Sequence, residues 1–192
     1  MSRVIFPIAA LTLLACVTQA QSAVVYTAAL TGASESPPTG SSATGNAVLT
    51  LDGNSLSVNV SFAGLIGGNA QAAHIHCCTP PGTNIPVAVG FPGFPATTSG
   101  TYQQTFDLTE ASVYTASFLT DFGGGTAAGA EAALIAGLND GQAYVNIHNE
   151  SFPGGEIRGF LTAVPEPASV LLLGVGLSLI VGTVRTSRPK RY

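Results

Sequence analysis

The chain has 192 residues, of which 46% are hydrophobic and only 8% are charged, with ten acidic side chains against six basic ones. Arg158 is the only Lys or Arg of the long central segment, since the others lie at the two ends: Arg3, Arg185, Arg188, Lys190 and Arg191. One arginine cannot form the basic surface that nucleic acids require, so DNA and RNA are excluded as partners. A lysine Schiff base and a phosphate-binding P-loop are excluded as well, because that segment contains no lysine.

Residues 1–23 are typical of a secretory signal peptide. A positively charged start precedes an apolar run over residues 4–17, and small residues then lead to a cleavage site after Ala20 or Ala23. The run is too short for an ordinary membrane span. An alternative stays open, because Cys16 ends a loose bacterial lipobox and would then carry lipid and begin the mature chain. Either route predicts an exported protein.

Residues 24–163 suit a single domain with its own hydrophobic core. Alternating apolar and polar residues predict strands at 46–52 and 55–62, joined as a hairpin by the turn Asp52-Gly53-Asn54. Further short strands are expected between Gly and Pro clusters, at 24–31, 70–76, 85–89, 101–108, 143–149 and 156–162. One short helix is expected near 127–137. The pattern predicts an all-β fold, an antiparallel β-sandwich or barrel with one short helix.

All three histidines fall within two of the predicted strands. His74 and His76 are two residues apart, so a strand places both imidazoles on one face. His148 ends the strand 143–149, and three imidazoles converge if the two strands are neighbours. Such a cluster suits copper or zinc. The alternative is structural, since histidines in strands commonly hydrogen-bond to their neighbours; no catalytic residue and no enzymatic activity is assigned.

Two adjacent cysteines, Cys77 and Cys78, follow the second histidine directly. Thiols tend to oxidise in the compartments that exported proteins enter. Three alternatives stay open: the pair forms a vicinal disulfide, joins a metal site, or bonds to outside partners. The cysteines are therefore secondary candidates for metal ligands, behind the histidines.

The pattern of one His-x-His strand with a distant third histidine resembles the copper side of Cu,Zn superoxide dismutases, which are also β-sandwich proteins. The chain departs from that family because it has only three histidines, and so no fourth one to bridge to zinc. A dismutase activity is therefore not predicted.

The central segment also resembles the CHRD domain, which is named for chordin and is found in many bacterial exported proteins. Five motifs in order carry the resemblance over about residues 25–162: G-x-x-E-x-P-P at 32–38, TGNA at 44–47, AHIH at 73–76, YVNIH at 144–148 and PGGEIRG at 153–159. The resemblance implies an immunoglobulin-like or dismutase-like β-sandwich without an established enzymatic activity.

Glu35 and Arg158 lie in two of these motifs. Because Arg158 is the one central base among nine acids, we expect it to hold a carboxylate, and Glu35 is preferred for its place in a matching motif. The alternative is that Arg158 is solvated and that Glu35 only shapes its turn.

Residues 164–192 have the features of a sorting signal. Three parts follow one another: the triplet Pro165-Glu166-Pro167, the uncharged apolar segment 168–184, and the basic tail 185–192 with Arg185 and Arg188. The apolar segment would span about 26 Å as a helix, enough to cross a slightly thinned bilayer with the basic tail in the cytoplasm. The arrangement resembles the PEP-CTERM signal of exopolysaccharide-producing Gram-negative bacteria. It implies recognition by an exosortase, removal of the helix and tail, and delivery to the surface or matrix; the alternative is a plain single-pass anchor.

These features together predict an exported protein of the cell envelope, cell surface or exopolysaccharide matrix, held transiently in the inner membrane by its C-terminal helix. Its expected partners are the exosortase, the export machinery, the membrane before processing, and the exopolysaccharide matrix. The central domain is expected to act as a structural or binding module. Two alternatives stay open: an extracytoplasmic copper- or zinc-binding protein with redox activity, and a module that recognises a protein partner.

Overall fold

The computed structural model describes residues 22–165. The strands and helices follow one another as β1 (Val24–Thr31), β2 (Thr44–Asp52), β3 (Ser55–Ala63), β4 (Ala70–His76), β5 (Val87–Gly90), β6 (Gly100–Asp107), α1 (Ala116–Asp121), α2 (Ala127–Asn139), β7 (Tyr144–Asn149), β8 (Ile157–Phe160) and β9 (Thr162–Ala163). No helix among these residues is long and apolar enough to cross a membrane. The predicted signal peptide up to residue 21, Cys16 included, and the predicted span 168–184 lie outside the described residues.

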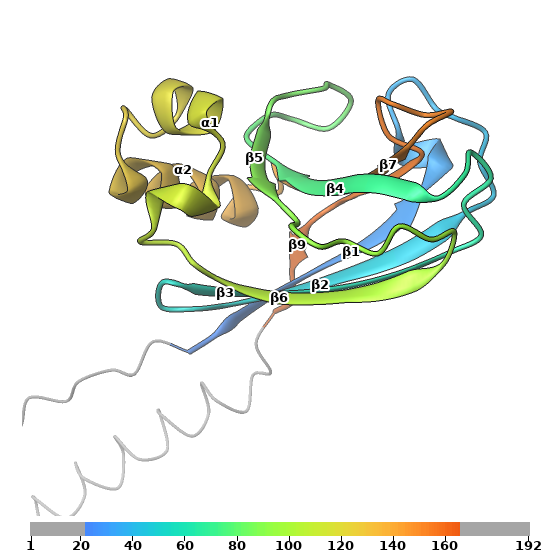
Figure 1. Ribbon diagram of the computed structural model, residues 1–192. Helices are drawn as coiled ribbons and strands as arrows, with labels where there is room; N and C mark the ends of the chain where they lie inside the picture. Colours follow the sequence, from blue (N-terminus) through green and yellow to red (C-terminus); the bar gives the residue numbers. More distant parts are fainter. Residues whose placement is uncertain (1–21, 166–192) are drawn as a thin grey trace, which may run out of the picture.

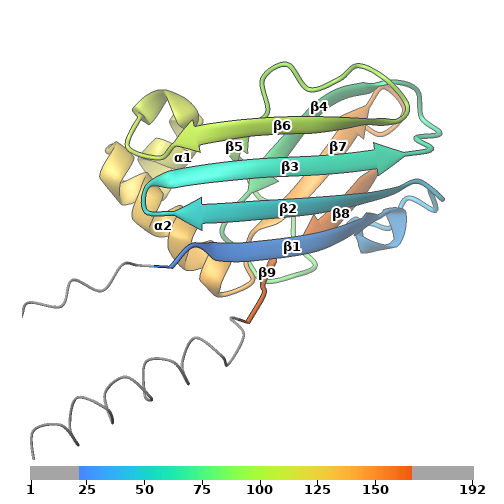
Figure 2. The same ribbon diagram turned by 90° about the horizontal axis from the view of Figure 1, so that it is seen from below.

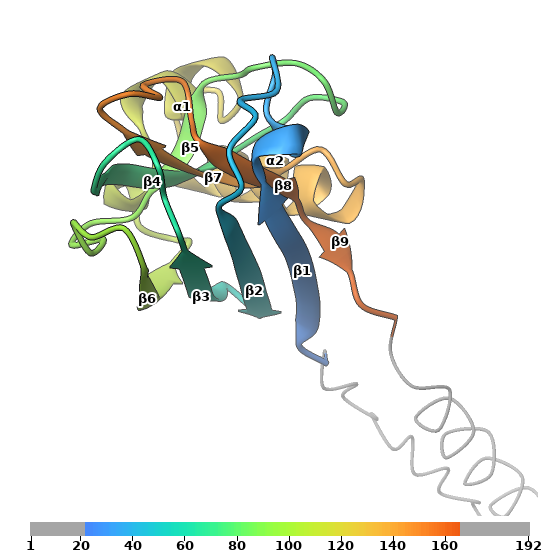
Figure 3. The same cartoon turned by 90° about the vertical axis from the view of Figure 1, so that its right-hand side faces the viewer.

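One antiparallel sheet contains all the strands and curls over on itself into a half-barrel. The strand order is β5-β4-β7-β8-β1-β2-β3-β6, and β9 pairs with β1. Figure 2 shows β1, β2, β3 and β6 side by side as one layer, and Figures 1 and 3 show β4 and β7 facing that layer from above. The predicted antiparallel, mostly β architecture is confirmed. The predicted sandwich is corrected in one respect, because hydrogen bonds run continuously from one layer to the other.

The layers are joined where the C-terminal strands cross β1. β8 pairs with β1 only through Arg158 and Thr31, and β9 takes over further along the same strand. Gly159 has no room for a side chain, because the carbonyl of Ala29 occupies the place of a Cβ. This close approach lets the chain turn the corner, and it explains why the predicted strand 156–162 is two short strands.

The hairpin of β2 and β3 forms as its alternation predicts. Every second residue of β3 is buried, and the buried set is apolar: Leu56, Val58, Val60 and Phe62. Gly53 adopts a φ of +56° in the connecting turn, a conformation that favours glycine.

Two α-helices close one end of the half-barrel, on the left in Figure 1. The expected helix near 127–137 is confirmed as α2, and α1 is an addition that the sequence did not predict. Thr115 and Thr126 cap the two helices, since each hydroxyl accepts a hydrogen bond from a backbone N–H three residues later. α1 has six residues, which is too short for a helical period to be visible in the sequence.

Candidate metal centre

The three histidines meet on the face of β4 and β7 that points away from the core. The two strands are neighbours, and one ligand atom from each of His74, His76 and His148 lies within 4.8 Å of the other two. The ring centroids are 5.0 to 6.1 Å apart. The alternate residues of the same strands point inward and are fully buried: Ile75, Val145 and Ile147. The cluster therefore forms because side chains alternate between the two faces of each strand and the two strands are neighbours.

The partners of each ring determine which nitrogen is free. His76 Nδ1 lies 2.6 Å from the carbonyl oxygen of Ile85, and His148 Nδ1 lies 2.9 Å from that of Pro153. A neutral imidazole that donates through Nδ1 keeps its lone pair on Nε2. His76 Nε2 and His74 Nδ1 are both buried and have no hydrogen-bond partner among the described residues. The donors free in the structure are therefore His74 Nδ1 and His76 Nε2. His148 Nε2 lies 2.9 Å from Asn146 Oδ1 and can join them only when Asn146 gives up this contact.

Asn146 belongs to the same polar face, although the sequence analysis gave it no role. Its side chain is 1% exposed, and its Oδ1 lies 2.9 Å from His148 Nε2. The position of Asn146 two residues before His148 was the available signal, since both must point to the same side of β7.

The environment keeps the three rings neutral. Burial, and to a smaller extent the neighbouring charges of His148 and His76, lower the pKa of His74 to about 4. Burial also lowers the pKa of His76 and of His148, against hydrogen bonds to the carbonyls of Ile85 and Pro153. Neutral imidazoles carry the lone pairs that metal binding needs.

These shifts predict that acid destabilises the metal-free protein. The pKa of His74 is about 4 in the fold against an ordinary value of 6.5, so between these values the unfolded chain binds more protons than the folded one. The free energy of unfolding should therefore fall as the pH is lowered through this window. Thermal unfolding measured between about pH 7 and pH 4.5 checks it, and His74→Gln should make the fall shallower. An equal slope in both proteins would contradict the prediction.

A buried ion pair lies behind the cluster. Arg158 Nε is 2.7 Å from Glu35 Oε2, and the two side chains are 1% and 3% exposed. Arg158 also donates to Asn84 Oδ1 at 2.8 Å, and its Cζ lies 4.7 Å from the centre of the Tyr144 ring. His76 stacks on the same ring, at a centroid distance of 4.7 Å and an interplanar angle of 4°. Burial raises the pKa of Glu35, and the guanidinium of Arg158 opposes that rise.

Glu156 is fully buried without a basic partner. Its Oε1 accepts from the backbone N–H of Ile66 at 2.8 Å and from the Ser41 hydroxyl at 2.6 Å. Its Oε2 accepts from the N–H of Gly67 at 3.1 Å and from the side-chain amide of Asn149. Burial acts to raise the pKa of Glu156, but these hydrogen bonds hold it below its usual value. The carboxylate therefore ties three loops together.

The cysteines lie apart from the cluster. Cys77 and Cys78 are joined in a disulfide, the first of the three alternatives considered, and Cys77 is fully buried. Gly137 of α2 packs against both sulfur atoms and has no room for a side chain. Disulfide sulfurs offer no thiolate, so only the histidines remain as ligands.

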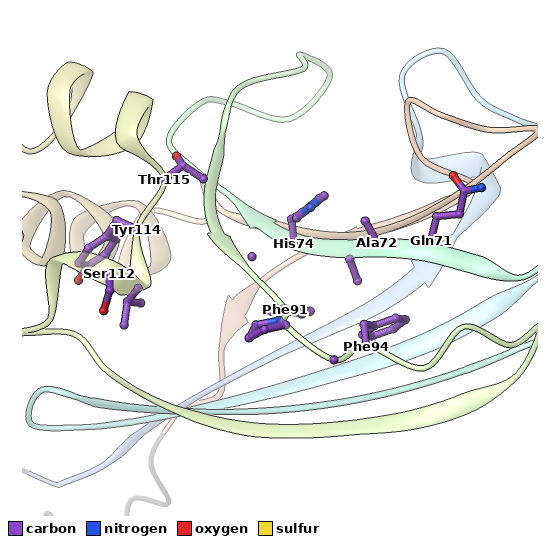
Figure 4. Close-up of a pocket in the computed structure, with 13 residues that line it drawn as sticks. Gln71, Ala72, His74, Phe91, Phe94, Ser112, Tyr114 and Thr115 are labelled. Atoms are coloured by element: carbon purple, nitrogen blue, oxygen red, sulfur yellow. The ribbon is translucent and has the colours of Figure 1, made fainter.

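A groove of about 500 Å³ adjoins the cluster at the edge formed by β5. Figure 4 shows His74 and Gln71 on β4, with Phe91, Phe94 and Tyr114 among the other lining residues. The aromatic side chains follow β5 and β6 in the chain, so only the fold brings them together. His74 is common to the groove and the histidine cluster.

Comparison with known families identifies two regions. The CHRD domain matches residues 26–161, and the PEP-CTERM protein-sorting motif matches residues 163–188. No curated protein and no solved structure matches the chain. The sorting motif marks an exported cell-surface protein that an exosortase processes; Pro165 is its last described residue, and Glu166, Pro167, Arg185 and Arg188 lie outside. Since the domain accounts for most of its length, the chain belongs to the CHRD domain family, with a PEP-CTERM sorting motif after the domain.

Proposed function

We propose that the protein is a surface or exopolysaccharide-matrix module of a Gram-negative bacterium, and that its CHRD domain binds a copper or zinc ion. His74, His76 and His148 are the proposed ligands. The C-terminal segment would hold the chain in the inner membrane until the exosortase removes it. We also propose that the fold of the domain is immunoglobulin-like or dismutase-like.

The two buried nitrogens without partners carry the proposal. A buried polar atom that makes no hydrogen bond is costly, and His74 Nδ1 and His76 Nε2 are two such atoms at one place. A metal ion would satisfy both. The carbonyls of Ile85 and Pro153 act on the far side of two rings, where they orient the imidazoles as outer-shell partners of metal ligands commonly do.

The surroundings favour binding over turnover. The cluster contains no carboxylate that could serve as a general base. The buried charged groups Arg158 and Glu35 are paired with each other, and Arg158 packs on the ring of Tyr144. A structural or binding role is therefore the function that the site supports best.

Elemental analysis after titration with copper and zinc tests the proposal. The whole chain, kept in mild detergent, is expected to retain one ion, and a variant with His74, His76 and His148 all changed to Ala is expected to retain none. Free metal at about 1,000 times its Kd should also stabilise the wild type by about 4 kcal/mol. The matched control changes three exposed residues of β3 to Ala, namely Ser57, Asn59 and Ser61. A folded wild type that retains no ion would leave the histidines as scaffold.

A further inference from the structure

We infer that the three-histidine cluster is a site for monovalent copper, an inference that rests on the proposed metal binding. The charge of the donor set, the field of the ion pair behind it and the number of donors each favour Cu⁺ over Zn²⁺ and Cu²⁺.

The donor set is uncharged. The cluster of the described residues consists of three imidazoles and includes no carboxylate or thiolate, and the nearby cysteines are held in a disulfide. The full charge of a bound ion would thus remain at a site where His76 is only 7% exposed. The cost of taking an ion out of water grows with the square of its charge, so a divalent ion pays about four times as much as a monovalent one.

A buried positive charge lies behind one of the ligands. Arg158 stacks on one face of Tyr144, and His76 stacks on the same ring at 4.7 Å. The guanidinium therefore lies one aromatic ring behind a ligand. Glu35 offsets part of this field, so the site tolerates a single positive charge better than two.

The number of donors points the same way. Zinc held by three protein ligands takes a water molecule as its fourth ligand, and Cu²⁺ prefers a tetragonal arrangement of ligands. Here three nitrogens come from one face of two neighbouring strands. Asn146 Oδ1 is the polar atom beside them, and it already contacts His148 Nε2. Cu⁺ has a filled d shell and accepts three nitrogen donors.

Competition with chelators tests the inference on the whole chain in mild detergent. Cu⁺ is titrated without oxygen against a Cu⁺-specific chelator, and Cu²⁺ and Zn²⁺ are titrated against chelators of known affinity. We expect one Cu⁺ per chain, bound more tightly than either Zn²⁺ or Cu²⁺. Tighter binding of either divalent ion would overturn the inference and leave the proposed function standing. Failure of all three ions to bind would remove both.

Glu35→Gln separates the electrostatic argument from a loss of structure. The substitution leaves Arg158 uncompensated, and the Coulomb energy between Arg158 and the ion is proportional to the ion's charge. A threefold loss of Cu⁺ affinity should therefore appear as about a ninefold loss for Zn²⁺. Equal factors for the two ions would overturn the electrostatic basis.

Asn146→Ala is the second variant, and it decides the inference even if Glu35→Gln does not fold. It should leave Cu⁺ affinity within about twofold of the wild type, because the inferred site has three nitrogen donors. A large loss of Cu⁺ affinity in a folded variant would make Asn146 a ligand and overturn the three-donor site.

Discussion

Replacing Arg158 by alanine is expected to lower the free energy of unfolding by about 3–5 kcal/mol. The substitution leaves Glu35 buried with no positive partner, and a carboxylate that is 3% exposed cannot recover its hydration without opening the structure. It also removes the cation that packs on Tyr144 and the hydrogen bond to Asn84. Denaturant unfolding followed by circular dichroism measures the loss.

A double-mutant cycle shows whether the loss comes from the pair. Arg158→Ala is compared in the wild type and in a Glu35→Gln background, where the carboxylate that faces Arg158 is gone. The substitution should cost at least 1 kcal/mol less in that background, a coupling typical of residues in contact, about 0.5–3 kcal/mol. An equal cost in both backgrounds would mean that Glu35 and Arg158 are not energetically coupled.

The histidine cluster could be predicted from the sequence only by assuming that the two strands that carry the histidines are neighbours in the sheet. The spacing of His74 and His76 fixes their common face, and the apolar partners Ile75 and Val145 fix which face is buried. Nothing in the sequence made β4 and β7 neighbours, because pairing between strands far apart in the chain depends on the whole topology. The sequence also did not show which ring nitrogens lack a hydrogen-bond partner, because this depends on backbone carbonyls in loops that the fold places beside the rings.

Local signals predicted most of the strands well, and long-range closure was not predictable. The hairpin at Gly53 needed only alternation and a turn residue, and both lie within a few positions of the chain. The single curled sheet depends instead on the approach of Gly159 to Ala29, two residues far apart in sequence. The disulfide of Cys77 and Cys78 was one of three open alternatives, because adjacency alone does not decide between them.

Glu156 shows most clearly what composition hides. Acidic residues are mostly exposed unless they are paired, and the chain has ten acids against six bases, yet Glu156 is fully buried. The sequence offers no basic partner that would indicate its burial, because the carboxylate is stabilised by hydrogen bonds from the backbone N–H groups of Ile66 and Gly67. A carboxylate bound in this way depends on three loops folding together, which no local pattern reveals.

Glu156→Ala is expected to have the larger effect of the two stability variants, and to unfold much of the protein near room temperature. It strands four donors, of which those of Gly67 and Asn149 are buried and the other two are partly buried. Each buried unsatisfied group costs about 1–3 kcal/mol, so the loss is a large part of the 5–15 kcal/mol stability of an ordinary domain. Glu156→Gln keeps the volume but turns one acceptor into a donor that faces other donors, so we expect a smaller loss of about 2–4 kcal/mol. Glu150→Gln is the matched control, because Glu150 is exposed and its change should stay within about 0.5 kcal/mol. Unfolding curves of the three variants decide the matter: if Glu156→Gln behaved like Glu150→Gln, the carboxylate would not hold the loops, and their anchoring would have to come from Asn149 and Ser41 alone.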